Sequence, residues 1–306
     1  MAAMFEQLGL IGCGLMGGSF ALAAKRAGLV KRVVGYSKSP STTEQARRMG
    51  VIDVEAPSAL LAVSGADIVL LAVPVAATEA TFKAIRHLIT PSMLIMDVGS
   101  TKRDVVDAAQ RVLRDHMSSF VPAHPITGKE VSGVEHADPE LYRGKQVILT
   151  PVEKTNGPHL SRATALWEAM GCHVQQMAPE AHDAAFAAVS HLPHLLAFAL
   201  VHGIVNQPLG KDFLGLAGPG FRDFTRIAAS DPVMWRDVFL NNKEAVLEML
   251  GRFSEDLAAL QRMIRWDDGT ALLELFTRTR AIRRGIIEAG QDTAEADFGR
   301  PHGHED

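Results

Sequence analysis

The chain has 306 residues, of which 35 are acidic and 31 basic, and 47% of its residues are hydrophobic. This balance is typical of a globular protein with one large domain or two ordinary ones. The formal charge of −4 excludes a general attraction to nucleic acid or to an anionic membrane. The two cysteines, Cys13 and Cys172, lie far apart, so we expect no disulfide framework and a reducing compartment.

No targeting or membrane segment is expected. The N-terminus lacks a basic segment followed by a long apolar run. The apolar stretch at residues 68–77 is broken by Pro74 and is too short to span a bilayer. We therefore expect a cytoplasmic protein that binds neither membrane nor nucleic acid.

The first half of the chain alternates short apolar runs with amphipathic stretches, which predicts repeated βα units around a parallel sheet. Strands are expected at residues 7–11, 32–35, 67–73 and 93–98, and again at 146–149 and 173–176, with a helix near 160–170 between the last two. A helix is expected at residues 41–49, where Ser41 and Glu44 have capping-box spacing. The predicted fold class is α/β, with a Rossmann-type doubly wound sheet in residues 1–178.

An all-α domain is predicted for residues 179–290, because the strand signals stop at Pro179. A helix should run through residues 186–205 with a bend near Pro193, and Asp231 with Pro232 should open another. Residues 291–306 are polar and rich in glycine, and we expect them to be disordered. One apolar stripe comprises Phe239, Val246, Leu250, Phe253, Leu257, Leu260 and Ile264. Its spacing suits either an ordinary core or the seam of a dimer.

A glycine loop lies directly after the first predicted strand, in "GLIGCGLMGGSFA". Gly12 permits a tight turn, Gly14 lets the backbone approach a pyrophosphate, and Gly17 lets the next helix pack on the sheet. The free N–H groups of that helix would face the phosphates. The alternative is a glycine-rich turn of some other α/β fold. The predicted cofactor contacts here are Gly12, Gly14, Leu15, Met16 and Gly17, together with Val73 and Pro74 at the end of a later strand.

The second predicted strand ends in "VVGYSKSP", which places Ser37 and Lys38 where the dinucleotide fingerprint expects an acidic residue. A hydroxyl beside a cation would accept a 2′-phosphate and lacks the usual ligand of the NAD ribose. NADP is therefore favoured over NAD, although Lys38 could equally be a solvated turn residue.

A second group of polar residues follows the strand near residue 97. Ser100 and Lys102, in "DVGSTKRDVV", should sit at the carboxyl edge of the sheet, where open α/β folds bind ligands. Ser100 could instead cap the next helix. His124 is fixed between Pro122 and Pro125 and should reach the same edge. An isolated histidine is more often structural than catalytic, but this one is predicted to lie beside a nicotinamide site.

Several long motifs occur in order along residues 8–287: "DVGSTK", "PAHPITGKEVSGVEHA", "LYRGKQVILTP", "SHLPH" and "PGFRDFTRIAASDPVMWRDVFLNNKEAV". Through them the chain resembles the prephenate/arogenate dehydrogenase family of tyrosine biosynthesis. The resemblance implies an oxidative decarboxylation, in which hydride leaves the ring carbinol carbon for nicotinamide and carbon dioxide leaves the opposite ring carbon. It implies that His124 takes the hydroxyl proton, that Ser100 hydrogen-bonds the hydroxyl and orients the histidine, and that Lys102 accompanies the ring carboxylate.

The same resemblance assigns substrate contacts to the helical half. Arg226 matches the substrate arginine, whose planar fork suits a carboxylate, while His194 and Trp235 match residues that close the pocket. A metal pair at His191 and His194 is the alternative for "SHLPH", and we expect no metal site, because a proline interrupts the helical spacing and no ligand cluster accompanies it.

The departures from the family pattern bear on specificity. Lys129 could contact the substrate side chain, where a cation favours the keto acid prephenate over arogenate, or it could be solvated. A homodimer through the helical domain is expected from the stripe and the resemblance. Two other functions remain open: a β-hydroxyacid dehydrogenase, which would share "GLIGCGLMG" but not "AHPITGKE", and an NADP-binding redox sensor without turnover.

Overall fold

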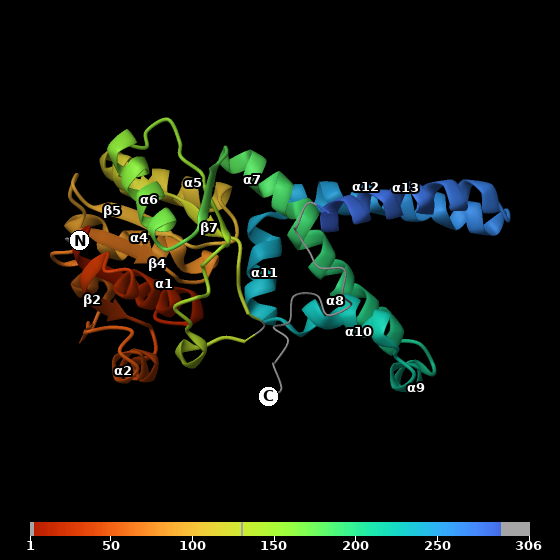
Figure 1. The fold of residues 1–306 in the computed structure, drawn as a ribbon, viewed down its shortest axis with the longest axis horizontal. Coiled ribbons are helices and arrows are strands. Elements are labelled where there is room, and N and C mark those ends of the chain that lie inside the picture. Colours follow the sequence, from red (N-terminus) through yellow and green to blue (C-terminus); the bar gives the residue numbers. More distant parts are fainter. Residues whose placement is uncertain (1–2, 130, 289–306) are drawn as a thin grey trace. The chain divides into compact units, whose positions relative to one another are not determined.

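The computed structural model describes residues 3–129 and 131–288, in which the chain forms two compact units (Figure 1). The sheet unit comprises Met1–Val189 and Ser230–Ala245, and the helical unit comprises Ser190–Ala229 and Val246–Asp306. The division therefore differs from a single boundary after residue 178, because two helices, α7 (Pro179–Phe186) and α11 (Pro232–Asn241), pack with the sheet unit. The expected disordered tail at 291–306 lies outside the described residues.

The main sheet has six parallel strands in the order β3-β2-β1-β4-β5-β6. The strands are β1 (Phe5–Ile11), β2 (Val30–Tyr36), β3 (Val54–Glu55), β4 (Ile68–Leu71), β5 (Leu94–Asp97) and β6 (Phe120–Val121). This is the order of a doubly wound dinucleotide-binding fold, whose ligand crevice opens at the carboxyl ends where the order reverses, here between β1 and β4. The predicted α/β class is confirmed.

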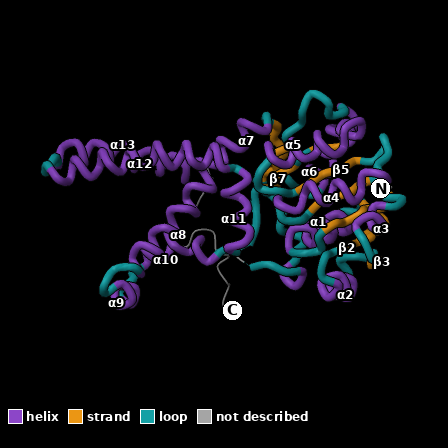
Figure 2. The backbone as a smooth tube through the Cα atoms, turned by 180° about the vertical axis from the view of Figure 1, so that it is seen from behind, coloured by secondary structure: helices purple, strands orange, loops and turns teal. Residues whose placement is uncertain are grey.

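Helices cover both faces of this sheet, as Figure 2 shows for the strands in orange. One hydrophobic core joins the sheet to α1 (Leu15–Arg26) and α6 (Gly157–Ala169). The other joins it to α3 (Ala59–Val63), α4 (Thr78–Ile85) and α5 (Arg103–Leu113). Burial on both faces explains why β4 and β5 are apolar almost throughout instead of alternating.

The helix expected at residues 41–49 is α2 (Pro40–Arg48), but the predicted capping box is wrong. The N-cap is Ser39, so Ser41 already lies inside the first turn, where its hydroxyl is 2.8 Å from the Ser39 hydroxyl. Glu44 instead forms an ion pair with Arg48 one turn later. Pro40 explains the shift, since a proline is tolerated at the first helical position.

Pro122 transfers the chain from the main sheet to a second sheet of three strands. This sheet contains β7 (Ala123–Pro125), β8 (Gln146–Leu149) and β9 (His173–Gln176), with β7 and β8 antiparallel. Pro122 has no N–H to give to a ladder, and its carbonyl accepts from Thr150 N at 2.9 Å. The change of sheet places His124 just beyond the carboxyl end of β6.

The bend expected near Pro193 is a π-helical segment, Ala187–His191, between α7 and α8 (Leu192–Val205). Pro193 falls in the first turn of α8, where its missing N–H is harmless. The continuous run Pro179–Val205 is 27 residues long with mean hydropathy 1.7, so by length and composition alone it could cross a membrane. Only 22% of its most apolar window is buried.

The helical unit contains α8, α9 (Gly210–Gly215), α10 (Pro219–Thr225) and most of α12 (Lys243–Arg265), followed by α13 (Gly269–Glu288). Short 3₁₀ turns of the chain are η1 (Val75–Ala77), η2 (Arg86–Leu88), η3 (Arg114–Ser119), η4 (Val134–His136) and η6 (Arg226–Ala229). The predicted apolar stripe starts on α11 with Phe239 and continues on α12. Val246 is buried, whereas Leu257 is 49% and Ile264 64% exposed. One chain therefore leaves much of the stripe uncovered.

Candidate active site

The glycine loop has the geometry that a dinucleotide requires. Gly12 has φ +96°, and a Cβ there would collide with the carbonyl of Ala72 on the neighbouring strand's exit. A Cβ on Gly17 would strike the carbonyl of Gly12. Gly14 differs, because a Cβ there would meet open space. The protein itself therefore does not demand a glycine at 14, whereas a pyrophosphate resting on the loop would.

Two hydrogen bonds connect this loop to neighbouring segments. The Cys13 amide donates to the Ser37 hydroxyl at 2.8 Å, and the Tyr142 hydroxyl donates to the Met16 carbonyl at 2.7 Å. Helix α1 begins at the buried Leu15, has no side-chain cap and has no acidic residue in its first turn. Its N-terminal N–H groups thus remain suited to an anion.

Ser37 lies between the end of β2 and the start of α2. Lys38 is exposed, and α2 begins next to it with no acidic residue in its first turn. The paired hydroxyls of Ser39 and Ser41 lie at the same helix end. On the other side of β1, Val73 is half-buried and Pro74 exposed at the carboxyl end of β4. The predicted cofactor residues therefore lie on the segments that leave the carboxyl ends of β1, β2 and β4, with Leu15, Met16 and Gly17 in the first turn of α1.

His124 lies on β7 and is 9% exposed. Its Nδ1 is 2.7 Å from Nε2 of His182, and its ring packs against Phe186 with a centroid distance of 4.8 Å. Both partners come from α7. The sequence prediction identified His124 but not the helix that holds its ring.

His182 connects His124 to a buried carboxylate. Its Nδ1 is 2.7 Å from Asp183 Oδ1, and the backbone amides of Lys102 and Arg103 donate to the two Asp183 oxygens at 2.9 Å. Burial alone would raise the pKa of Asp183, but the hydrogen bonds from His182 and from these amides outweigh it and lower that pKa. Burial lowers the pKa of His182 despite the neighbouring carboxylate, so this ring is neutral near pH 7. The adjacent His–Asp pair in an apolar helix was the available sequence signal.

The expected substrate contact of Lys102 disagrees with the geometry. Its ammonium is fully buried, forms an ion pair with Asp97, and donates to the Ala123 carbonyl at 2.8 Å. Asp97 also accepts from the Ala123 amide at 3.1 Å. Lys102 and Asp97 thus hold the carbonyl and the amide of Ala123, the residue before His124, which is a structural role.

Ser100 is half-buried in the loop after β5 and does not cap α5, whose N-cap is Lys102. The pairing of β5 with β6, and the bond from Ala123 N to Asp97, bring the Ser100 loop and the His124 strand to one edge of the sheet. The location expected for both residues is therefore what the structure shows.

Lys129 lies in the loop after β7, where its ammonium pairs with Asp138 at 3.0 Å. A hydrogen bond from the Glu140 amide, followed by that from Lys129, lowers the pKa of Asp138. The Asp138 amide in turn donates to Ser19 on α1 at 2.9 Å.

The remaining predicted residues lie on helices. In the helical unit, His194 is on α8 and Arg226 begins η6, and α8 and η6 pack against each other. His194 Nδ1 donates to the Ser190 carbonyl at 2.9 Å, and burial lowers the pKa of this ring. Trp235, on α11 of the sheet unit, is buried and stacks on Phe239 at 5.4 Å. Within residues 3–129 and 131–288, no group of three or more His, Cys, Asp or Glu side chains could hold a metal ion.

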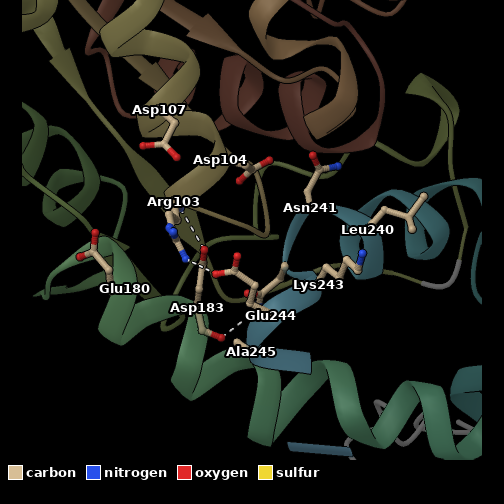
Figure 3. Close-up of a pocket in the computed structure, with 11 residues that line it drawn as sticks. Arg103, Asp104, Asp107, Glu180, Asp183, Leu240, Asn241, Lys243, Glu244 and Ala245 are labelled. Atoms are coloured by element: carbon tan, nitrogen blue, oxygen red, sulfur yellow. Dashed lines mark hydrogen bonds and ion pairs between the residues drawn. The ribbon is translucent and has the colours of Figure 1, made fainter. Parts of the chain in front are cut away.

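A hollow of about 370 Å³ opens between α5, α7 and the start of α12. None of the predicted site residues lines it. Figure 3 shows its charged wall, where Arg103 donates to Asp183 through its amide and to Glu244 through its guanidinium at 2.5 Å. Its lining includes five acidic residues, Asp104, Asp107, Glu180, Asp183 and Glu244, against Arg103 and Lys243. This excess of negative charge would repel an anionic substrate, so the hollow is not the substrate site.

Comparison with known proteins identifies the family of this chain. The family model of the prephenate dehydrogenase nucleotide-binding domain matches residues 20–176, and that of the prephenate dehydrogenase dimerization domain matches residues 178–278. The chain belongs to the prephenate dehydrogenase family. The resemblance noted in the sequence is thereby confirmed, and the protein is a dehydrogenase of tyrosine biosynthesis with a pyridine-nucleotide cofactor.

Three relatives show how far the similarity extends. The prephenate dehydrogenase of Bacillus subtilis is 36% identical over 94% of this chain and 77% of its own length. The cyclohexadienyl dehydrogenase of Zymomonas mobilis is 35% identical over 92% of this chain and 97% of its own. The crystal structure of prephenate dehydrogenase from A. aeolicus, in complex with hydroxyphenyl propionate and NAD+, is 38% identical and has a TM-score of 0.86. The match spans 92% of this chain and 98% of the A. aeolicus chain.

Proposed function

We propose that the protein oxidatively decarboxylates prephenate to 4-hydroxyphenylpyruvate with NADP as its preferred oxidant, and accepts arogenate as a second substrate. The observation that carries this proposal is the position of His124. It is a buried imidazole at the carboxyl edge of a dinucleotide-binding sheet, fixed by a second histidine and a carboxylate. Such an arrangement suits a general base that works next to a nicotinamide ring.

The predicted site residues have expected roles in this reaction. The glycine loop and the N-terminus of α1 would hold the pyrophosphate, and bound nicotinamide would supply a hydride acceptor. His124 would take the proton of the ring hydroxyl, and Ser100 would hydrogen-bond the same hydroxyl and orient the histidine. Arg226 would bind a substrate carboxylate through its planar fork, and His194 and Trp235 would enclose the side chain.

Preference between the two ring acids depends on the charge near the substrate side chain. A cation near the side chain favours the keto acid prephenate over arogenate, which bears an ammonium group. Lys129 is the candidate, but Asp138 largely neutralises it. We therefore expect a modest preference for prephenate and measurable turnover of arogenate.

The direct test is a comparison of initial rates for prephenate and arogenate, each with NAD and NADP, followed by the absorbance of the reduced nicotinamide. The highest kcat/KM is expected for prephenate with NADP. Cofactor binding without oxidation of either ring acid would support a redox sensor instead. Oxidation of 3-hydroxy acids alone would support a β-hydroxyacid dehydrogenase.

The substitution Ser37→Asp is expected to move the preference from NADP toward NAD by tens-fold in the ratio of KM values. A carboxylate at 37 would face the 2′-phosphate with a like charge. At about 4 Å, such repulsion amounts to roughly 1 kcal/mol in water and about 4 kcal/mol at a partly shielded surface. It would also accept both hydroxyls of the NAD ribose, and it could still accept from the Cys13 amide. Because residue 37 is remote from His124, kcat should change little.

The matched control is Ser37→Thr, which keeps the hydroxyl and should leave the ratio unchanged. A wild type that already prefers NAD, or an unmoved ratio in Ser37→Asp, would leave Lys38 a solvated turn residue and overturn the NADP assignment.

We further propose that the protein is a cytoplasmic homodimer assembled through its helical unit. Large apolar side chains are exposed there along α12 and α13, including Leu257, Ile264 and Phe276. A monomer would hold them in water, whereas a second copy of the same surface would bury them.

Light scattering at micromolar concentration is expected to give twice the chain mass. The variant Leu257→Glu should shift the protein toward monomer, because a carboxylate would be desolvated at the seam. Met49→Glu, which changes an exposed apolar residue of the sheet unit, is the control and should remain dimeric. A monomeric wild type, or recovery in the membrane fraction through the helix Pro179–Val205, would contradict the proposal.

A further inference from the structure

We propose that His182 and Asp183 are positioning residues that fix the tautomer of His124, so that its Nε2 carries the lone pair that accepts the substrate proton. This inference rests on the proposed role of His124 as the general base. It goes further by assigning functions to two residues that sequence motifs did not single out, and by naming which ring nitrogen reacts.

The ionised carboxylate of Asp183 determines which atom donates in its hydrogen bond with His182, and this in turn determines the donor between His182 and His124. Ionised Asp183 can only accept, and its two oxygens already receive the amides of Lys102 and Arg103. His182 Nδ1, at 2.7 Å from Oδ1, must therefore carry a proton and donate it. A neutral His182 then has an unprotonated Nε2, which can only accept.

The acceptor on His182 fixes which nitrogen of His124 carries the proton. Its Nδ1 lies 2.7 Å from that acceptor and so must be the protonated nitrogen. The neutral ring has one N–H, which leaves Nε2 as the base. In the opposite tautomer, two lone pairs would face each other at hydrogen-bond distance inside the protein.

Buried contacts hold the side chains of His182 and Asp183 in this orientation. The His182 side chain is fully buried, Asp183 is 4% exposed, and both lie on α7 beside Phe186, whose ring packs against both histidines. The Asp183 carbonyl also accepts from the Asn242 side chain at 2.9 Å, which ties α7 to the end of α11.

Only one proton moves in this step, from the substrate hydroxyl to His124, and no proton passes on to His182 or Asp183. As hydride leaves the carbinol carbon, the O–H bond breaks and an N–H bond forms at His124 Nε2. The imidazolium that results keeps its Nδ1–H bond to His182. The negative Asp183 orients His182 and favours this positive charge, while His182 keeps its Nδ1 proton and Asp183 stays ionised.

The decisive measurement is the nitrogen-15 spectrum of the histidine side chains, with His124 assigned by its loss in His124→Asn. The wild type is expected to show a protonated Nδ1 and an unprotonated Nε2 at His124. In His182→Leu the two tautomers should mix, and kcat should fall by roughly 10–100-fold, the usual cost of removing a residue that orients a functional histidine, while the KM for the cofactor stays constant.

Two further variants separate positioning from packing. His182→Gln can accept from His124 through its carbonyl and donate to Asp183 through its amide, so it should recover most of the lost kcat. His159→Leu changes another buried histidine, whose Nε2 bonds to the Pro91 carbonyl, and should alter neither kcat nor the His124 spectrum. A protonated Nε2 in the wild type, an unchanged kcat in His182→Leu, or a folded His182→Gln as slow as His182→Leu would each overturn the inference.

Failure of the proposed reaction would look different. A wild type that oxidises neither ring acid but shows the Nδ1–H tautomer at His124 would refute the reaction and leave the tautomer assignment intact. An active wild type with the opposite tautomer would do the reverse.

Discussion

The variant His124→Asn is expected to lose turnover by on the order of 10²–10⁴-fold, the usual contribution of a general base. An asparagine amide has no basic nitrogen, so nothing at position 124 could take the hydroxyl proton. Its N–H can still donate to His182 Nε2, so the contacts of α7 should persist. The fold and the affinity for NADP should therefore be retained.

Pre-steady-state and steady-state rates with prephenate would measure this loss, with fluorescence of bound NADPH as the binding control. Wild-type activity should also fall in acid, because a protonated imidazole cannot accept the proton. Near-normal turnover in His124→Asn, with the protein folded, would remove His124 from the chemistry.

The second large effect is expected on stability. Lys102→Met should lower the free energy of unfolding by about 3–5 kcal/mol, because it leaves the Asp97 carboxylate charged and buried without its cation. The Ala123 carbonyl loses its donor in the same step. Methionine has a similar length, so the loss would not come mainly from a cavity.

Urea denaturation followed by circular dichroism would measure the change, with Lys31→Met as the matched control. Lys31 pairs with Glu6 at an exposed position, and such pairs contribute little. Equal stability losses in the two variants would contradict the structural role of Lys102. A stable Lys102→Met protein with a raised KM for prephenate would restore the substrate contact that the sequence suggested.

Elements with strong local signals could be predicted from the sequence. The strands expected at 146–149 and 173–176 have the same bounds as β8 and β9, and the other predicted strands match to within two residues at their ends. Asp231 was predicted to open a helix, and its carboxylate does accept from the amides of Val233 and Met234. In each case the deciding interaction lies within a few residues.

Interactions between distant segments could not be predicted in this way. The contact of His124 with His182 spans 58 residues, and it depends on how α7 packs against β7. Lys102 was expected at the ligand edge because its sequence position is correct, but its side chain turns inward to Asp97 and Ala123. The predicted capping box failed for a local reason, since Pro40 starts α2 one residue early. The roles of Ser100, Lys129, His194, Arg226 and Trp235 remain predictions.

The exposed apolar side chains of α12 and α13 have a consequence for assays. If the helical unit is completed by a second copy, its folding free energy includes a term that depends on chain concentration. Arg226 and His194 belong to that unit, so dilution would disorder the residues that are to bind substrate before it affects the sheet unit. Specific activity should then fall in very dilute enzyme, and the thermal midpoint should rise with protein concentration, while NADP binding changes little.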